Sequence, residues 1–525
     1  MSAWGRPSFA VNRPSSITLD VAMCAPYTET VARCGKLSFS QVSKGISMRY
    51  RALILAASVL LCLVIAGCNS TGLPGPATSN PTPTTPQSTA TAVALAFDTP
   101  TADPFFGATR TATPKAGATQ VEPTARATGT AVSNATPVPN STIEAQNLAT
   151  LKEIERQDAL FRGLKPLADV PAQFISSDQL RENLTKEMEQ YYSKEDAKND
   201  ATELWLMRLI DKRDIDLYQL QIDLQSEQVL GYYDQKVKEF FVRSDGTKLS
   251  PTAKETLAHE YVHALQDQHY DLQKLLPDQT TDDDKATAIR SLVEGDATVS
   301  GTLFAQSHFS PAEYQSIIDD SANSDTTVLD SAPKYISDSL YFPYNEGVQF
   351  VIALGITNSF DPINKALADP PVSSEQIMHP EKYTAANRDM PQIVAAPPLT
   401  DTLGAGWTHS DNGTLGEFDL KELLTFNKAT DPDGAAAGWG GGTYNLYTNA
   451  DNALSMINTT WDTTKDATEF EDALNETFAN DTKDGNVIVG SDGLRFYEVK
   501  RTNDDISVLA STDRAALEKA ITAVK

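Results

Sequence analysis

Leu257-Ala258-His259-Glu260-Tyr261-Val262-His263-Ala264-Leu265 is an H-E-x-x-H sequence inside an apolar pattern of helical spacing. On an α-helix, positions i and i+4 lie on the same face, so His259 and His263 can direct ring nitrogens toward one metal ion. Glu260 follows the first histidine and is placed to accept a proton from a water that the metal activates. The pattern therefore predicts the chemistry of a zinc hydrolase.

A catalytic zinc ion requires a third protein ligand and one open position. The cysteines lie at Cys24, Cys34, Cys62 and Cys68, so none follows residue 68. The third ligand must then be His, Asp or Glu, and Glu294 is the best candidate. It lies in the segment 287–300, whose helical apolar spacing predicts a second helix packed on the first. A capping or surface carboxylate is the alternative role for Glu294, and Asp296 is a candidate for orienting a ligand histidine.

Hydrolysis through a tetrahedral intermediate also needs a hydrogen-bond donor for the developing oxyanion. We take His379 as the first candidate, with Tyr383 and Tyr344 as alternatives. A buried structural histidine beside Pro380 is the competing interpretation of His379. His269 lies ten residues after His259 and out of the i, i+4 register, so we expect it at the surface.

Together, His259-Glu260-x-x-His263 and Glu294-Gly-x-Ala resemble the gluzincin class of zinc peptidases, which includes thermolysin-like enzymes and alanyl-type aminopeptidases. Thr298 stands where thermolysin-like enzymes have Asp. The resemblance implies a zincin-like fold, one Zn²⁺ per chain and a peptide or protein substrate. Between about 150 and 475 the chain also resembles a group of largely uncharacterised bacterial metallopeptidase-like lipoproteins. The further stretches that carry this second resemblance are Gly231-Tyr232-Tyr233-Asp234, Phe342-Pro343-Tyr344, Gln376-Ile377-Met378-His379-Pro380, Leu415-Gly416-Glu417 and Gly438-Trp439-Gly440-Gly441.

The sequence before residue 146 is predicted to consist of three segments. Residues 1–47 have no assigned role and are predicted to be disordered. Residues 48–67 combine a positive start with an apolar run that ends in Ile65-Ala66-Gly67-Cys68, which resembles a bacterial lipoprotein signal with Cys68 as the lipidated residue. An uncleaved transmembrane anchor is the alternative. Residues 68–145, rich in Thr, Pro and Ala, are predicted to be a disordered tether.

After Cys68 the chain carries 36 Lys and Arg against 68 Asp and Glu, a net charge near −32. This charge argues against nucleic acid as a partner. The membrane is expected to be reached through the lipid at Cys68, with the folded part on the extracytoplasmic side.

Residues 146–525 are predicted to form one zincin-like α+β domain, with a possible subdivision near 375. We expect it to be predominantly helical, with a small antiparallel sheet above the H-E-x-x-H helix. A hairpin at 229–242 supplies two strands, and the strand at 240–243 either binds a peptide by adding it to the sheet or is purely structural. The glycines at 438–442 predict close backbone packing. Near the C-terminus we expect helices at 467–478 and 515–524 and strands at 494–499 and 506–510.

The sequence thus favours an exported, lipid-anchored zinc metallopeptidase. Glu260 is the expected general base and His259, His263 and Glu294 are the expected zinc ligands. Two alternatives stay open. One is a non-catalytic binding lipoprotein that retains the fold, and the other is an envelope scaffold with both histidines in its core.

Overall fold

A computed structural model describes residues 140–277, 280, 282–356 and 359–524. The segments predicted at 1–47 and 48–67, the lipidation site Cys68 and residues 68–139 of the tether lie outside this range. Helix α3 begins at Asn140, so residues 140–145 are helical. The prediction that these residues belong to the tether is therefore wrong. Among the described helices, none has the length and apolar character that crossing a membrane requires.

Four helices lie near the start of the described chain, and reciprocal capping boxes mark the starts of two of them. Ser176 accepts a hydrogen bond from the Gln179 backbone N–H, and the Gln179 side chain accepts from the Ser176 backbone in return. Ser193 and Asp196 form the same reciprocal box. These helices agree with the expectation of a predominantly helical domain. Their bounds are α3 (Asn140–Arg162), α4 (Ser177–Tyr191), α5 (Lys194–Leu206) and α6 (Leu217–Gln228).

A three-stranded sheet in the order β1-β3-β2 lies beside these helices. Strands β2 (Gly231–Asp234) and β3 (Glu239–Arg243) form the predicted antiparallel hairpin, and β1 (Ala172–Ile175) pairs parallel to β3. The sheet is therefore mixed, and the prediction of an antiparallel sheet is wrong. The prediction that the strand at 240–243 adds a peptide is also wrong, because β3 is central and both of its edges are paired. The strand that contacts α7 with an open edge is β2.

Helix α7 (Pro251–Tyr270) carries the H-E-x-x-H sequence. Ser250 caps its start by accepting from the Ala253 backbone, and Pro251 occupies the first turn. The helix ends at Asp271, whose φ of 58° breaks the helical path and whose side chain caps α8 (Leu272–Leu275). Most side chains of α7 are buried, including His259 and His263. The sequence motif therefore lies inside the molecule.

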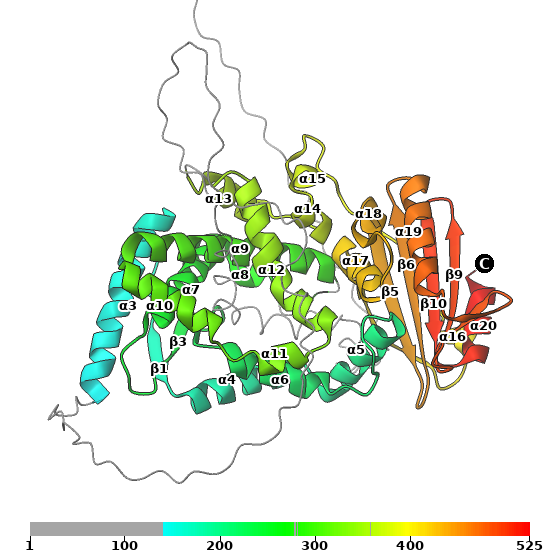
Figure 1. The fold of residues 1–525 in the computed structure, drawn as a ribbon, viewed down its shortest axis with the longest axis horizontal. Coiled ribbons are helices and arrows are strands. Elements are labelled where there is room, and N and C mark those ends of the chain that lie inside the picture. The colour runs from blue at the N-terminus through cyan, green and yellow to red at the C-terminus, as the bar shows by residue number, and fades with distance from the viewer. Residues whose placement is uncertain (1–139, 278–279, 281, 357–358, 525) are drawn as a thin grey trace, which may run out of the picture. The chain divides into compact units, whose positions relative to one another are not determined.

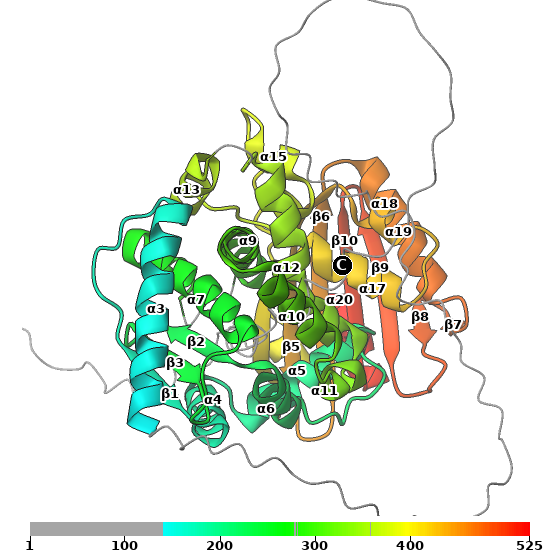
Figure 2. The same ribbon diagram turned by 60° about the vertical axis from the view of Figure 1, so that its left-hand side comes forward.

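Helix α9 (Asp283–His308) packs against α7, which confirms the predicted second helix, although it is longer than the predicted segment. Figure 2 shows α9 nearly end-on between α7 and α12 (Lys334–Ala353). Helices α9 and α12 cross at two glycines, since a Cβ at Gly295 would collide with the Gly347 carbonyl and one at Gly347 with the Ser291 carbonyl. Only glycine permits this approach. The crossing fixes Glu294, next to Gly295, against α12.

Short helices connect this bundle to the rest of the described chain. Ser310 caps α10 through a box with Glu313. Pro343 lies inside α12, directly before Tyr344. The remaining helices before the second sheet are α10 (Pro311–Ala322), α11 (Thr327–Ser331), α13 (Asp361–Ala368), α14 (Ser374–Met378), α15 (Pro380–Thr384) and α16 (Thr400–Leu403).

A seven-stranded antiparallel sheet forms the C-terminal part, drawn in orange and red in Figure 1. Its order is β4-β5-β6-β10-β9-β8-β7, and the sequence predicted only β9, β10 and the two helices nearest the C-terminus. One face packs with α19 through Trp461 and Phe470, and the other with α16 and α20 through Leu509 and Leu517. The elements are β4 (Thr408–Thr414), α17 (Glu417–Phe426), α18 (Pro432–Ala436), β5 (Trp439–Thr448), β6 (Ala453–Trp461), α19 (Thr464–Thr477), β7 (Thr482–Asp484), β8 (Val487–Val489), β9 (Phe496–Thr502), β10 (Asp505–Ser511) and α20 (Arg514–Ala523).

The glycines at the start of β5 confirm the prediction of close backbone packing. A Cβ at Gly441 would lie 2.5 Å from the Gln392 carbonyl oxygen, and one at Gly442 would lie 2.6 Å from the Leu415 carbonyl oxygen. Two backbone segments therefore pass over this strand at distances that any side chain would block.

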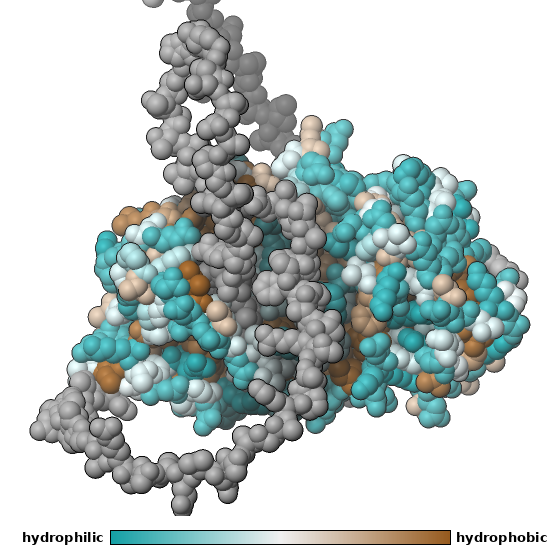
Figure 3. Space-filling view, viewed as in Figure 1, coloured by the Kyte–Doolittle hydropathy of each residue, from teal (hydrophilic) through white to brown (hydrophobic). Residues whose placement is uncertain are grey.

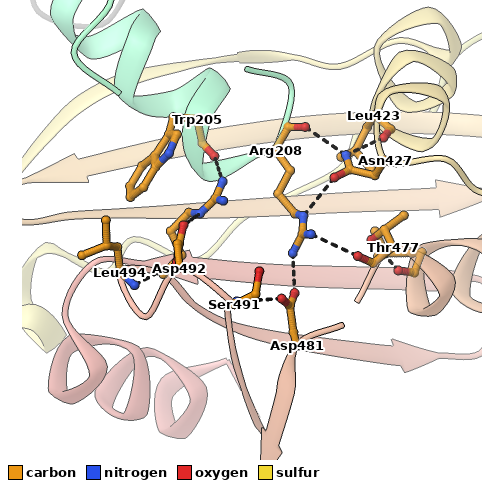
Figure 4. Close-up of polar contacts among 11 residues, drawn as sticks. Trp205, Arg208, Leu423, Asn427, Thr477, Asp481, Ser491, Asp492 and Leu494 are labelled. Carbon is orange, nitrogen blue, oxygen red and sulfur yellow. Dashed lines mark hydrogen bonds and ion pairs between the residues drawn. The ribbon is translucent and has the colours of Figure 1, made fainter. Parts of the chain in front are cut away.

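Arg208 joins the turn after α5 to the C-terminal sheet region (Figure 4). Its Nε donates to Asn427 Oδ1 at 3.1 Å, Nη1 to Asp481 Oδ2 at 2.5 Å and Nη2 to the Thr477 carbonyl at 3.0 Å. The guanidinium also lies 4.9 Å from the centre of the Phe478 ring. Each of these donors therefore reaches a protein acceptor, and the ion pair is structural.

Candidate metal centre

Three donor atoms from α7 and α9 meet at one point. The Nε2 atoms of His259 and His263 lie 3.0 Å apart. Glu294 Oε2 lies 3.3 Å from each of them. All three side chains are buried. The structure thus brings together the three residues that the sequence predicts as ligands.

The spacing of these atoms fits one tetrahedral metal ion. With bonds of about 2.0–2.1 Å, two ligand atoms on a tetrahedral zinc ion lie about 3.3–3.4 Å apart. The observed separations of 3.0 and 3.3 Å agree closely with that value. Two imidazoles and one carboxylate also form a known ligand set of catalytic zinc. The residues present therefore fit the ion.

Charge in this cluster is concentrated on Glu294 and His263. Burial alone would lower the pKa of His263, but the Glu294 carboxylate raises it to about 9. Burial lowers the pKa of His259, with Glu294 opposing the shift. Burial works against ionisation of Glu294, yet the two histidines lower its pKa to about 2. An anion and a ring proton thus occupy the place where a divalent cation would bind, and metal binding would displace the proton.

Glu260 lies beside the three donor atoms. One of its carboxylate oxygens accepts a hydrogen bond, and the other has no partner among the described residues. The backbone N–H of Tyr233 in β2 donates to Glu260 Oε2 at 2.9 Å. Glu260 Oε1 is buried and has no hydrogen-bond partner among the described residues. A carboxylate oxygen of Glu260 lies within 4.8 Å of ring nitrogens of both histidines. Burial raises the pKa of Glu260 to about 8, close enough to neutral pH for this carboxyl both to accept and to release a proton.

Asp296, predicted to orient a ligand histidine, reaches His263 only through another residue. His263 Nδ1 lies 2.9 Å from Gln266 Oε1, and Gln266 Nε2 donates to Asp296 Oδ2 at 2.7 Å. Arg162 of α3 holds the same carboxylate with two hydrogen bonds of 2.9 Å. Asp296 therefore acts on His263 across an amide.

Tyr344, one of the alternative oxyanion donors, lies at the cluster. It is fully buried on α12, one turn before the glycine that crosses α9. Burial, followed by the charges of Glu294 and Glu260, raises the pKa of Tyr344 well above its usual range. The hydroxyl therefore lies within electrostatic range of both carboxylates and remains protonated, as a donor must.

His379 lies apart from the cluster. Its Nε2 is 2.9 Å from Glu417 Oε1 on α17, and this hydrogen bond raises the pKa of His379. The preceding helix α14 begins where the Ser374 backbone donates to Asp284 Oδ1, in the first turn of α9. Glu294 lies ten residues further along α9, which is about 15 Å at the helical rise. The structure therefore does not bring His379 to the three donors.

The other predicted positions are also away from the site. Tyr383 donates its hydroxyl to the Asp369 carbonyl at 2.8 Å. His269 lies in the last turn of α7, where its Nε2 contacts the Lys165 carbonyl at 2.8 Å. Of the candidates for an oxyanion donor, the structure places only Tyr344 beside the cluster.

A cavity opens beside the donors, between β2, α7 and α9. The wall from β2 is the open edge of that strand, because the Tyr233 N–H points from it to Glu260. Residues that line the cavity include Tyr233, His263, Leu272, Leu276, Val293 and Glu294. An extended backbone edge and two of the three donor residues thus border the same space.

Residues 402–521 match the family described as a domain of unknown function (DUF8575). This match covers the seven-stranded sheet and helices α17 to α19, and it stops short of α7 and α9. No curated protein and no solved structure matches the chain. The match therefore bears on the sheet region, and the histidine–glutamate cluster is interpreted from its own geometry.

Sequence reasoning missed the roles of Gln266, Tyr233 and Arg162. Gln266 carries a detectable signal, because it follows His263 by three residues on a buried face of α7. Tyr233 acts on Glu260 through its backbone N–H, so its side chain carries no signal for that contact. Arg162 is 134 residues from Asp296 in the sequence, and no local pattern predicts that contact.

Proposed function

We propose that this chain is a zinc-dependent peptidase in which His259, His263 and Glu294 hold one Zn²⁺. The observation that carries this proposal is the triangle of three buried donor atoms, 3.0–3.3 Å apart, with Glu260 beside it. The resemblance of the sequence to gluzincins supports the same assignment. Water activation by the ion and a carboxylate is the chemistry that this arrangement favours.

Each group at the proposed site has a separate role in hydrolysis. Bound zinc supplies Lewis-acid activation of water and of a carbonyl oxygen. Glu260 Oε1 accepts the proton of the attacking water and later donates it to the leaving amine. The Tyr233 N–H holds Oε2, so that Oε1 is the oxygen that exchanges the proton. The Tyr344 hydroxyl donates to the substrate oxygen as negative charge develops on it.

Substrate binding is proposed along the outer edge of β2. An extended peptide that pairs with an exposed strand gains backbone hydrogen bonds without requiring a particular sequence. The edge of β2 borders the cavity that also contains His263 and Glu294. A peptide paired there would pass directly in front of the donor cluster.

The location of the protein is proposed from the sequence. The signal-like segment and Cys68 support export and a lipid anchor, which place the folded part on the extracytoplasmic side. The net charge near −32 after Cys68 makes nucleic acid an unsuitable partner. On the face shown in Figure 3, hydrophilic residues dominate the described surface and apolar residues form small separate patches.

Metal analysis combined with a peptide library tests this proposal. The purified protein is expected to hold about one zinc per chain and to cleave peptides. A zinc-loaded protein that cleaves nothing would favour the non-catalytic binding lipoprotein. A protein without zinc would favour the scaffold with both histidines in its core.

A further inference from the structure

A continuous chain of buried hydrogen bonds leads from a proposed zinc ligand to the first described helix. It starts at His263 Nδ1, 2.9 Å from Gln266 Oε1, and continues from Gln266 Nε2 to Asp296 Oδ2 at 2.7 Å. Arg162 closes the chain by donating to both oxygens of Asp296 at 2.9 Å. Gln266, Asp296 and Arg162 are fully buried, so water does not substitute for any of these contacts.

The orientation of the Gln266 amide follows from its surroundings. Its nitrogen faces the Val293 carbonyl at 3.0 Å and the Asp296 carboxylate at 2.7 Å. Both are acceptors, so the NH₂ end of the amide must point to them. The amide oxygen then faces His263 and accepts a hydrogen bond, which requires the proton on Nδ1. In the neutral ring, the lone pair of His263 is thereby placed on Nε2, the atom that faces His259 and Glu294.

Arg162 is held so that it can keep Asp296 in place. Its third guanidinium nitrogen, Nη1, donates to Asn364 Oδ1 at 2.8 Å, and its Cζ lies 4.5 Å from the centre of the Phe360 ring. Asp158, one turn earlier on α3, is buried, and burial raises its pKa to about 8. At neutral pH that carboxyl is therefore mostly protonated, and the positive charge of Arg162 pairs with Asp296.

We propose that Gln266, Asp296 and Arg162 are positioning residues that fix the tautomer and orientation of His263 for metal binding. This inference rests on the proposed function, because it assigns the three residues to the same zinc site. The amide carries no charge, so it orients the ring without adding a second anion next to Glu294. Through Arg162, helix α3 becomes part of the zinc site, although it lies far from α7 in the sequence.

Zinc affinity, measured by competition with a chelator, tests the relay independently of catalysis. Gln266→Leu keeps the approximate volume but removes the acceptor for Nδ1, and we expect zinc to bind about 10- to 100-fold more weakly. Gln268→Leu is the matched control, since Gln268 lies on the same helix and contacts the backbone at 167–168. This control should bind zinc as the wild type does. Nitrogen NMR of the zinc-loaded wild type should show His263 protonated at Nδ1.

A second variant separates positioning from a simple loss of folding. The double substitution Arg162→Met with Asp296→Leu removes both buried charges together, which proteins tolerate better than the loss of one partner. It should weaken zinc binding to a similar extent while the protein still melts cooperatively. Unchanged zinc affinity in both variants, with the wild type loaded, overturns the relay alone. A wild type that takes up no zinc overturns the relay and the proposed function together.

Discussion

Two buried polar clusters in this molecule differ in how their groups are satisfied. Around Arg208, the guanidinium donors reach Asn427, Asp481 and the Thr477 carbonyl, and the remaining Asp481 oxygen accepts from the Ser491 backbone (Figure 4). Around His259 and His263, the donor atoms of three side chains converge on one point instead of pairing outward. The first cluster is closed by its own hydrogen bonds, whereas the second is the cluster that we propose binds a cation.

This difference separates a structural role from a chemical one. Satisfied buried charges hold two parts of a protein together, and removing one partner destabilises the fold. Buried groups that converge with an open oxygen beside them, as Glu260 Oε1 does here, are typical of functional sites. Substitutions in the two clusters should therefore affect different properties.

The largest expected effect is at Glu260. Glu260→Gln removes the proton acceptor but preserves shape, so kcat for peptide cleavage should fall by about 10²- to 10⁴-fold while zinc content is unchanged. Steady-state kinetics with elemental analysis of the same samples measure both. Full activity in this variant would contradict the role of Glu260 as base.

Tyr344 should give the next largest effect. Tyr344→Phe removes only the hydroxyl, so we expect kcat to fall by about 10²- to 10³-fold with little change in KM or zinc content. His379→Gln is the comparison, because its ring pairs with Glu417 away from the cluster. If His379→Gln lost activity at constant stability while Tyr344→Phe kept it, the assignment of the donor would be reversed.

Arg208 tests the structural side of the comparison. Arg208→Met leaves Asp481 buried without its cation, and the free energy of unfolding should fall by about 2–4 kcal/mol. Zinc content should not change. Arg156→Met, which breaks an exposed pair with Glu153, should leave the free energy of unfolding almost unchanged. Chemical denaturation of both variants makes the comparison, and equal losses would show that the Arg208 cluster is not a structural joint.

The smallest expected effect concerns pH. Burial raises the pKa of Glu255 from 4.5 to about 8, so the folded state retains a proton that the unfolded state releases. Stability from this group is present below pH 4.5 and is lost as pH rises toward 8. Between pH 5 and 8 the free energy of unfolding should therefore fall, and Glu255→Gln should remove this loss. Denaturation at several pH values tests this prediction, with the exposed Glu144→Gln as control. If the prediction is wrong, the difference in unfolding free energy between the wild type and Glu255→Gln will not change with pH.

The elements that sequence predicted best are those with local signals. Ser250 and Pro251 mark the start of α7, and the hairpin of β2 and β3 follows from two β-prone runs around a polar turn. Glu294 reached the cluster as expected because helical spacing and the missing cysteines narrowed the choice. The glycines before Thr443 packed against backbone, as their lack of side chains requires.

Features that depend on long-range contacts were not predicted from the sequence. Strand β1 pairs with β3 across more than sixty residues, which made β3 central and moved the open edge to β2. The core strands β5 and β6 of the large sheet were not recognised as a pair. Tyr344 reaches the cluster only because Gly295 and Gly347 let two helices cross closely. None of these contacts can be predicted from a short segment of sequence.

The central claim is that His259, His263 and Glu294 form one metal site. The most direct measurement is the zinc content of the purified chain after dialysis against metal-free buffer, for the wild type and for His263→Ala. We expect about one zinc per chain in the wild type and almost none in the variant, because two ligands do not complete the site. A wild type without zinc, or a variant that retains it, would contradict the claim.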